Sequence, residues 1–159
     1  MNVEQNGRQN RRQENRRPVQ LLLVEDDDVD AMAVRRALNK HRIANPVLRA
    51  HDGVEALEML HRDITQPPVI VLLDLNMPRM NGLEFLDQLR ADPVWSSVVV
   101  FVLTTSAAES DIDAAYRRHV AGYIVKKNAG ADFVEAIRML EHYWCVVELP
   151  DENGAATAR

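Results

Sequence analysis

Several features that define broad protein classes are missing from this sequence. A single cysteine, Cys145, excludes an internal disulfide framework. No apolar run approaches the roughly 18 residues that a membrane span requires, and the N-terminus has no hydrophobic core of the kind found in secretory signals. The five histidines show none of the HxH or HExxH spacings typical of zinc sites. We therefore expect a cytoplasmic protein with no membrane partner.

Recognition motifs for nucleotides and nucleic acids are missing as well. The sequence contains no glycine-rich phosphate-binding loop, no helix-turn-helix pattern and no basic recognition stripe. Too few residues follow Cys145 to build a further domain. We expect no DNA-binding output domain, so the output of this chain has to be a protein surface.

The formal net charge of −5 is unevenly distributed. Residues 1–18 contain five arginines against two glutamates, a charge of +3, and the rest of the chain carries −8. This segment has almost no apolar side chains to bury, so we expect a disordered basic tail. A weak arm for nucleic acid or anionic lipid is the alternative, but interleaved aromatic residues are absent.

Five apolar runs alternate with five stretches of helical periodicity. The run at 69–73 consists only of valine, isoleucine and leucine, which indicates a strand buried on both faces of a parallel sheet. The predicted strands are residues 19–24, 46–50, 69–73, 98–105 and 121–127, with the second at the periphery. The predicted helices are residues 29–42, 53 to just before Pro67, 82–93, 109–120 and 131–144.

The first predicted helix presents Met32, Ala33, Ala37 and Leu38 at helical spacing, with Asp28 or Asp30 as its cap. Strictly alternating strands and helices predict a doubly wound α/β fold with right-handed crossovers. At this length the flavodoxin-like five-stranded parallel sheet, in the order 2-1-3-4-5, is the expected architecture.

Chemically active side chains follow four of the predicted strands. They are Glu25, Asp26 and Asp27 after the first, Asp74 after the third, Thr104 and Thr105 at the fourth, and Lys126 and Lys127 at the fifth. In the order 2-1-3-4-5 these four strands are neighbours, so their carboxyl ends meet at the edge where open α/β sheets bind ligands. Each residue alone is more often a cap, a turn or a solvated loop residue. Together they predict a site.

The residue types at this edge indicate phosphoryl chemistry. Packed carboxylates raise one another's pKa unless a cation lies among them, and hard oxygen ligands suit Mg²⁺. A lysine and a hydroxyl opposite the carboxylates can bind phosphate oxygens. A carboxylate beside metal and lysine is a candidate nucleophile toward phosphorus, which would give an aspartyl-phosphate.

Four segments, LLLVEDD, VLLDLNMPRMNG, VLTTSA and AGYIVK, together resemble the receiver domain of two-component response regulators. The resemblance covers Val19 to about Trp144, which implies a receiver domain at 19–144 and a C-terminal extension and tail at 145–159. It also implies a histidine kinase as partner. The chain is then a phosphoacceptor signalling protein rather than an enzyme, with slow self-dephosphorylation.

The resemblance implies a role for each residue at the predicted edge. Asp74 is the phosphoacceptor, Thr104 the switch hydroxyl and Lys126 the phosphate-binding lysine. The metal ligands are Asp26 directly, Glu25 through water, Asp74, and Asn76 by its backbone carbonyl. Tyr123 matches the aromatic residue whose rotation reports phosphorylation, and Asn76 and Ser106 fall where the family tunes hydrolysis of the phosphoryl group.

Two features of the C-terminal part narrow the resemblance. Lys127 and Asn128 follow Lys126, where the family usually has a proline after the lysine. A cis peptide bond before a residue other than proline costs about 2.5–4 kcal/mol, so we expect a trans bond here and a different loop shape. The ending, residues 131–150, is similar to the single-domain regulators that pair with bacterial phytochrome kinases, several of which are dimers. The apolar residues at 143–147 need covering, either by their own domain or by a homodimer through the C-terminal helix and extension.

Two other functions fit parts of the pattern. A phosphatase of the haloacid-dehalogenase type also uses a strand-end aspartate, but it needs a second acid two residues on, where this chain has Asn76. A binding module that keeps the fold and signals without phosphate is the other alternative. The presence of Asp26, Asp74, Thr104 and Lys126 favours a phosphorylated signalling switch over both.

Overall fold

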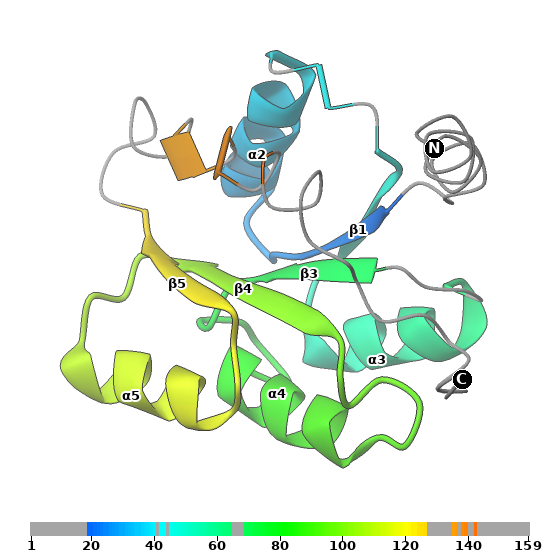
Figure 1. The fold of residues 1–159 in the computed structure, drawn as a ribbon, viewed down its shortest axis with the longest axis vertical. Coiled ribbons are helices and arrows are strands. Elements are labelled where there is room, and N and C mark those ends of the chain that lie inside the picture. The colour runs from blue at the N-terminus through cyan, green and yellow to red at the C-terminus, as the bar shows by residue number, and fades with distance from the viewer. Residues whose placement is uncertain are drawn as a thin grey trace, which may run out of the picture.

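The computed structural model describes residues 19–40, 42–43, 45–64, 69–126, 135–136, 138–139 and 142. In chain order the elements are β1 (Gln20–Val24), α2 (Asp28–Lys40), β2 (Val47–Ala50), α3 (Gly53–Arg62), β3 (Val69–Leu73), α4 (Gly82–Ala91), β4 (Val99–Thr104), α5 (Glu109–Arg117) and β5 (Gly122–Val125). All strand pairs are parallel, and the order in the sheet is β2-β1-β3-β4-β5 (Figure 1). The predicted α/β fold and strand order are therefore confirmed.

The sheet separates two hydrophobic cores. Helix α2 packs on one face, where its apolar side chains meet those of β1, β3 and β4, and α3, α4 and α5 cover the opposite face (Figure 1). Every residue of the central strand β3 is buried, as its unbroken apolar run predicts. The edge strand β2 is mostly half-buried, which agrees with its partly polar sequence.

The register of the strands brings their carboxyl ends level. Val24 of β1 is opposite Leu73 of β3, and Leu73 is opposite Val102 of β4. Thr104, the last residue of β4, is opposite Val125 of β5. The polar residues that follow these positions therefore leave the sheet along a single edge.

The expected cap of helix α2 is wrong, and the expected apolar face is right only at Ala37 and Leu38. Its capping residue is Asp27, whose carboxylate Oδ1 accepts a hydrogen bond from the backbone N–H of Asp30 at 2.8 Å. The buried face consists of Ala31, Val34, Ala37 and Leu38, whereas Met32 is 51% exposed. Because successive helical residues are separated by about 100°, Met32 points away from the face on which its neighbour Ala31 is buried.

The loops at the site edge are held by capping interactions. Asn81 and Glu84 form a capping box at the start of α4. Asp52 caps α3 by accepting the Glu55 N–H at 2.9 Å, and its second oxygen accepts a 2.6 Å bond from Arg79. Asp52 therefore ties the start of α3 to the loop that follows β3.

We expect Asp52→Ala to lower the free energy of unfolding by about 2–3 kcal/mol, because it removes a helix cap and a charged hydrogen bond. Burial raises the pKa of Asp52, but the bonds from Arg79 and from backbone donors outweigh it and leave the pKa below its usual value. Ionised Asp52 therefore stabilises the folded protein at pH values above its unfolded-state pKa of about 3.9. This stabilisation is lost as the pH falls through the lower folded-state pKa of Asp52.

Urea unfolding at neutral pH and near pH 3 measures this effect. The gap between the wild type and Asp52→Ala should narrow in acid. Glu58→Ala is the matched control, since Glu58 is an exposed acid on the same helix and its removal should cost less than about 0.5 kcal/mol. An equal loss in both variants would contradict the role of Asp52.

Several predictions lie outside the described residues. They concern the basic tail at 1–18, the loop after Lys126, the apolar face of the predicted last helix and the segment 145–159. Among the described residues, no helix has the length and apolar character to cross a membrane.

Candidate functional site

Three carboxylates meet at the carboxyl edge of the sheet. Glu25 and Asp26 directly follow β1, and Asp74 directly follows β3. The Asp74 N–H donates to the Val24 carbonyl at 3.0 Å, which keeps the two strand ends paired up to the site. One ligand oxygen from each of Glu25, Asp26 and Asp74 lies within 4.8 Å of the other two. Clustered carboxylate oxygens suit a hard divalent cation such as Mg²⁺.

Glu25 is the most deeply buried member of this group, with 1% of its surface exposed. Its Oε1 accepts the backbone N–H of Asp27 at 3.0 Å, and its Oε2 accepts a 2.5 Å bond from the Lys126 ammonium. Burial raises the pKa of Glu25 to about 7, assisted by the charge of Asp74 and opposed by Lys126. A buried negative charge of this kind requires cations nearby.

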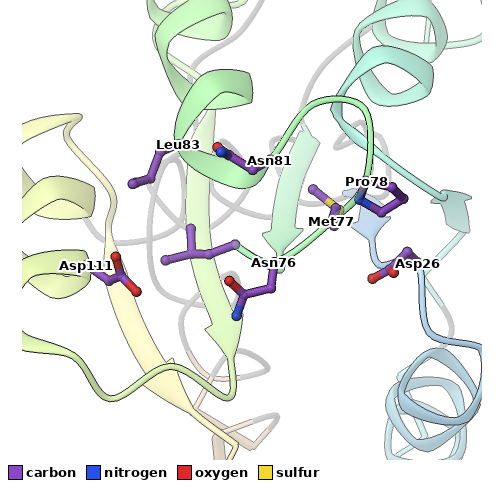
Figure 2. A pocket seen from close by; sticks show the side chains of 8 residues that line it. Asp26, Asn76, Met77, Pro78, Asn81, Leu83 and Asp111 are labelled. Carbon is purple, nitrogen blue, oxygen red and sulfur yellow. The ribbon is translucent and has the colours of Figure 1, made fainter.

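Asp74 is buried next to an open hollow. It is 8% exposed, and its Oδ1 accepts the backbone N–H of Asn76 at 3.3 Å. A hollow of about 410 Å³ lies beside the residues that follow Asp74, bounded by Asp26, by the loop of Asn76–Pro78 and, on the far side, by Asp111 of α5 (Figure 2). The carboxylate edge is thus accessible to a ligand from the side of the loops.

Lys126 approaches the carboxylates from the end of β5. Its Nζ lies 2.5 Å from Glu25 Oε2 and 3.0 Å from Asp30 Oδ2. Burial lowers the pKa of the Lys126 ammonium, but the bonds and charges of Glu25, Asp30 and Asp74 outweigh it and raise the pKa above its ordinary value. The positively charged ammonium of Lys126 therefore lies beside the carboxylates, as the strand order predicts. Within the described residues its hydrogen bonds go to Glu25 and Asp30, not to Asp74.

Thr104 and Tyr123 are joined through Ser106. Thr104 is fully buried, and its Oγ1 faces the Ser106 N–H at 3.5 Å. The Tyr123 hydroxyl donates to the Ser106 carbonyl at 2.9 Å, and burial raises the pKa of this phenol. The Ser106 hydroxyl in turn donates to Asp111 Oδ2 at 2.6 Å. The loop between β4 and α5 is therefore connected to both predicted switch residues.

Three residues that shape this edge were not predicted from the sequence. Arg49 of β2 donates to the carbonyls of Glu25 and Asp26 and pairs with Asp28 at 2.7 Å, so it fixes the backbone of the acidic loop. Asp30 pairs with Lys126, and Asp111 holds Ser106. For Asp30 and Asp111 the sequence did offer an indication. Both lie in the first turn of a helix, α2 and α5, and the N-termini of these helices follow the carboxyl ends of β1 and β4.

Comparison with known proteins agrees with this geometry. The family model of the response regulator receiver domain matches residues 21–138. The response regulator Rcp1 of Synechocystis sp. is 33% identical over 138 residues, 84% of this chain and 94% of that protein.

Two solved structures are also similar. The crystal structure of the phosphorylated cyanobacterial phytochrome response regulator RcpA has a TM-score of 0.76 at 31% identity, and covers 84% of this chain and 99% of that one. Response regulator RPA3017, in red light signalling of R. palustris, has a TM-score of 0.74 at 35% identity, with the same coverage. The family match spans most of the sequence, so the chain belongs to the family of response regulator receiver domains.

Proposed function

We propose that this protein accepts a phosphoryl group from a histidine kinase on Asp74 and thereby switches a protein-interaction surface. The observation that carries the proposal is the convergence of Asp26, Asp74, Thr104 and Lys126 at the ends of four neighbouring strands. Membership of the receiver family supports it, because receiver domains are phosphoacceptor signalling proteins.

In the proposed reaction a carboxylate oxygen of Asp74 attacks the phosphorus of a phosphohistidine. A P–O bond forms, the P–N bond breaks and the imidazole leaves, so the product is an acyl phosphate on Asp74. Such transfers are accelerated mainly by positioning and by neutralising charge on the phosphoryl oxygens. Lys126 supplies one positive charge, and the hydroxyl of Thr104 is a donor at the same strand edge.

Asp26, Glu25, Asp74 and the backbone carbonyl of Asn76 are the residues proposed to hold Mg²⁺. The donor set fits, since three carboxyl groups share one edge and Glu25 is buried there, where its negative charge needs a cation nearby. Bound there, the ion would supply positive charge to the phosphoryl oxygens. The similar regulator Rcp1 has a solved Mn²⁺-bound form, which supports a divalent cation at such a site.

Thr104 and Tyr123 are proposed to relay the state of Asp74 to the surface. Thr104 is buried at the end of β4, and any movement toward new phosphoryl oxygens acts on Ser106, which Thr104, Tyr123 and Asp111 all contact. The hydrogen bonds of the loop between β4 and α5 can thus differ between the unphosphorylated and the phosphorylated state. We propose α5, β5 and the residues following them as the output surface.

The similarity to RcpA and RPA3017 supports pairing with a phytochrome-type kinase. We propose the receiver domain at 19–144, flanked by the basic tail and the extension at 145–159, and a homodimer through that extension. The acyl phosphate on Asp74 is proposed to hydrolyse slowly on its own.

Incubation with acetyl phosphate and Mg²⁺, followed by intact-protein mass spectrometry, tests the proposed function. The expected result is the added mass of one phosphoryl group that depends on the metal. No adduct with either acetyl phosphate or a phosphorylated kinase would overturn the proposal, and rapid turnover of unrelated phosphate esters would favour a phosphatase instead.

Asp26→Ala is expected to weaken Mg²⁺ binding about 30-fold or more. Removing one unit charge some 4 Å from a divalent ion costs about 2 kcal/mol even at the dielectric constant of water. Calorimetric titration with Mg²⁺ measures the change. Asp28→Ala is the matched control, because Asp28 belongs to the same acidic run but its carboxylate pairs with Arg49 and is 81% exposed. Equal affinities in the two variants would contradict the proposed ligand set.

A further inference from the structure

Lys126 has two carboxylate partners that differ in their exposure to water. The Lys126 side chain is 10% exposed, that of Glu25 is 2% exposed and that of Asp30 is 40% exposed. Glu25 leads out of β1 into the acidic loop, whereas Asp30 lies in the first turn of α2. One ammonium group is therefore shared between a buried acid and a half-exposed acid.

Breaking the Lys126–Glu25 ion pair costs more than breaking the Lys126–Asp30 ion pair. If Lys126 left Glu25, a buried carboxylate would lose its compensating charge, which is a costly change. If Lys126 left Asp30, water would replace it at a half-exposed oxygen, and exposed ion pairs contribute little. An ammonium that turns toward a new anion would therefore keep Glu25 and release Asp30.

A phosphoryl group on Asp74 is such an anion, because the acyl phosphate carries up to two negative charges in place of the single charge of the carboxylate. The charge of Asp74 already acts on Lys126, although the ammonium is not hydrogen-bonded to it. The ammonium has three N–H donors in a tetrahedral arrangement, and two of them are aimed at Glu25 and Asp30. To reach the phosphoryl oxygens the ammonium has to move toward Asp74, so Asp30 and the phosphoryl group compete for its position.

We propose that Asp30 is a positioning residue that holds Lys126 in the unphosphorylated protein and opposes its transfer to the phosphoryl group. This inference rests on the proposed function of Asp74. Its consequence is that Asp30 sets how strongly the site favours the phosphorylated form. Loss of the Asp30 carboxylate should make that form easier to reach, although the variant removes an interaction from the site.

Binding of beryllium trifluoride, a phosphoryl mimic, in the presence of Mg²⁺ tests the idea on the full chain. Asp30→Asn is expected to bind the mimic about two- to fivefold more tightly than the wild type, the factor that corresponds to one half-exposed ion pair. Asp30→Glu should return the affinity toward the wild-type value. A residue that merely stabilised the fold would leave the affinity unchanged or lower it.

Asp28→Asn is the matched control for charge. It removes one acid from the same turn of α2, but Asp28 pairs with Arg49 rather than with Lys126. Tighter binding by Asp30→Asn than by Asp28→Asn supports the proposal. Equal binding by the two variants, or weaker binding by Asp30→Asn, overturns it. A wild-type protein that binds no mimic at all would instead overturn the proposed function.

Discussion

Asp74→Asn gains no phosphoryl mass under conditions in which the wild type is phosphorylated. An amide oxygen is a poor nucleophile compared with a carboxylate, and it cannot form the acyl phosphate. The replacement has nearly the same shape, and its side-chain oxygen can still accept the Asn76 N–H, so the buried position tolerates it. The loss is expected to be complete, and intact-protein mass spectrometry after treatment with acetyl phosphate and Mg²⁺ measures it.

Asp111→Asn is the control for this variant. Asp111 also faces the hollow but lies on α5, across from Asn76 (Figure 2). It makes a hydrogen bond with Ser106 that an amide can partly replace. This variant should still take up one phosphoryl group. An adduct of wild-type extent on Asp74→Asn would place the acceptor on another residue and contradict the assignment.

The edge of the sheet was predictable because its determinants are local in the sequence. An unbroken apolar run fixes β3 as a central strand, and in a parallel sheet the residue after such a strand lies at the carboxyl edge. Recognising the strand at 69–73 is therefore enough to locate Asp74 at the carboxyl edge of the sheet. The strand order then brings Glu25, Thr104 and Lys126 to the same edge, which required only the alternation of strands and helices.

The partners of these side chains were not predictable in the same way. The contact between Asp30 and Lys126 joins residues 96 positions apart, and it depends on the start of α2 and on the lysine rotamer. Neighbouring residues of a helix point about 100° apart, so a small error in locating the apolar stripe of α2 was enough to include Met32, which is exposed. The contacts of Arg49 were not predictable either, since two of its bonds go to the backbone carbonyls of Glu25 and Asp26, which carry no sequence signal.

Two glycines, Gly82 and Gly53, each begin a helix at a position where an added Cβ would come closer than 3 Å to a neighbouring atom. Gly82 is the first residue of α4, and a Cβ there would lie 2.6 Å from the Asp74 carbonyl oxygen and 2.8 Å from Leu75 Cα. Gly53 is the first residue of α3, and its added Cβ would meet mainly the flexible end of Met80, with the Phe85 Cβ at 3.0 Å. Backbone has to move in the first case and a side chain in the second.

Gly82→Ala is therefore expected to displace the backbone of Asp74, the proposed phosphoacceptor, whereas Gly53→Ala is expected to be tolerated. Overpacking against backbone costs about 2–3 kcal/mol of stability, and a shift of about 1 Å at a reacting group can lower its rate about 100-fold. Both variants gain the same helix propensity, so the difference between them isolates the contact with Asp74. Urea unfolding and the rate of phosphorylation by acetyl phosphate measure the two effects. If Gly82→Ala is phosphorylated as fast as Gly53→Ala, the close approach of α4 to the end of β3 does not position Asp74.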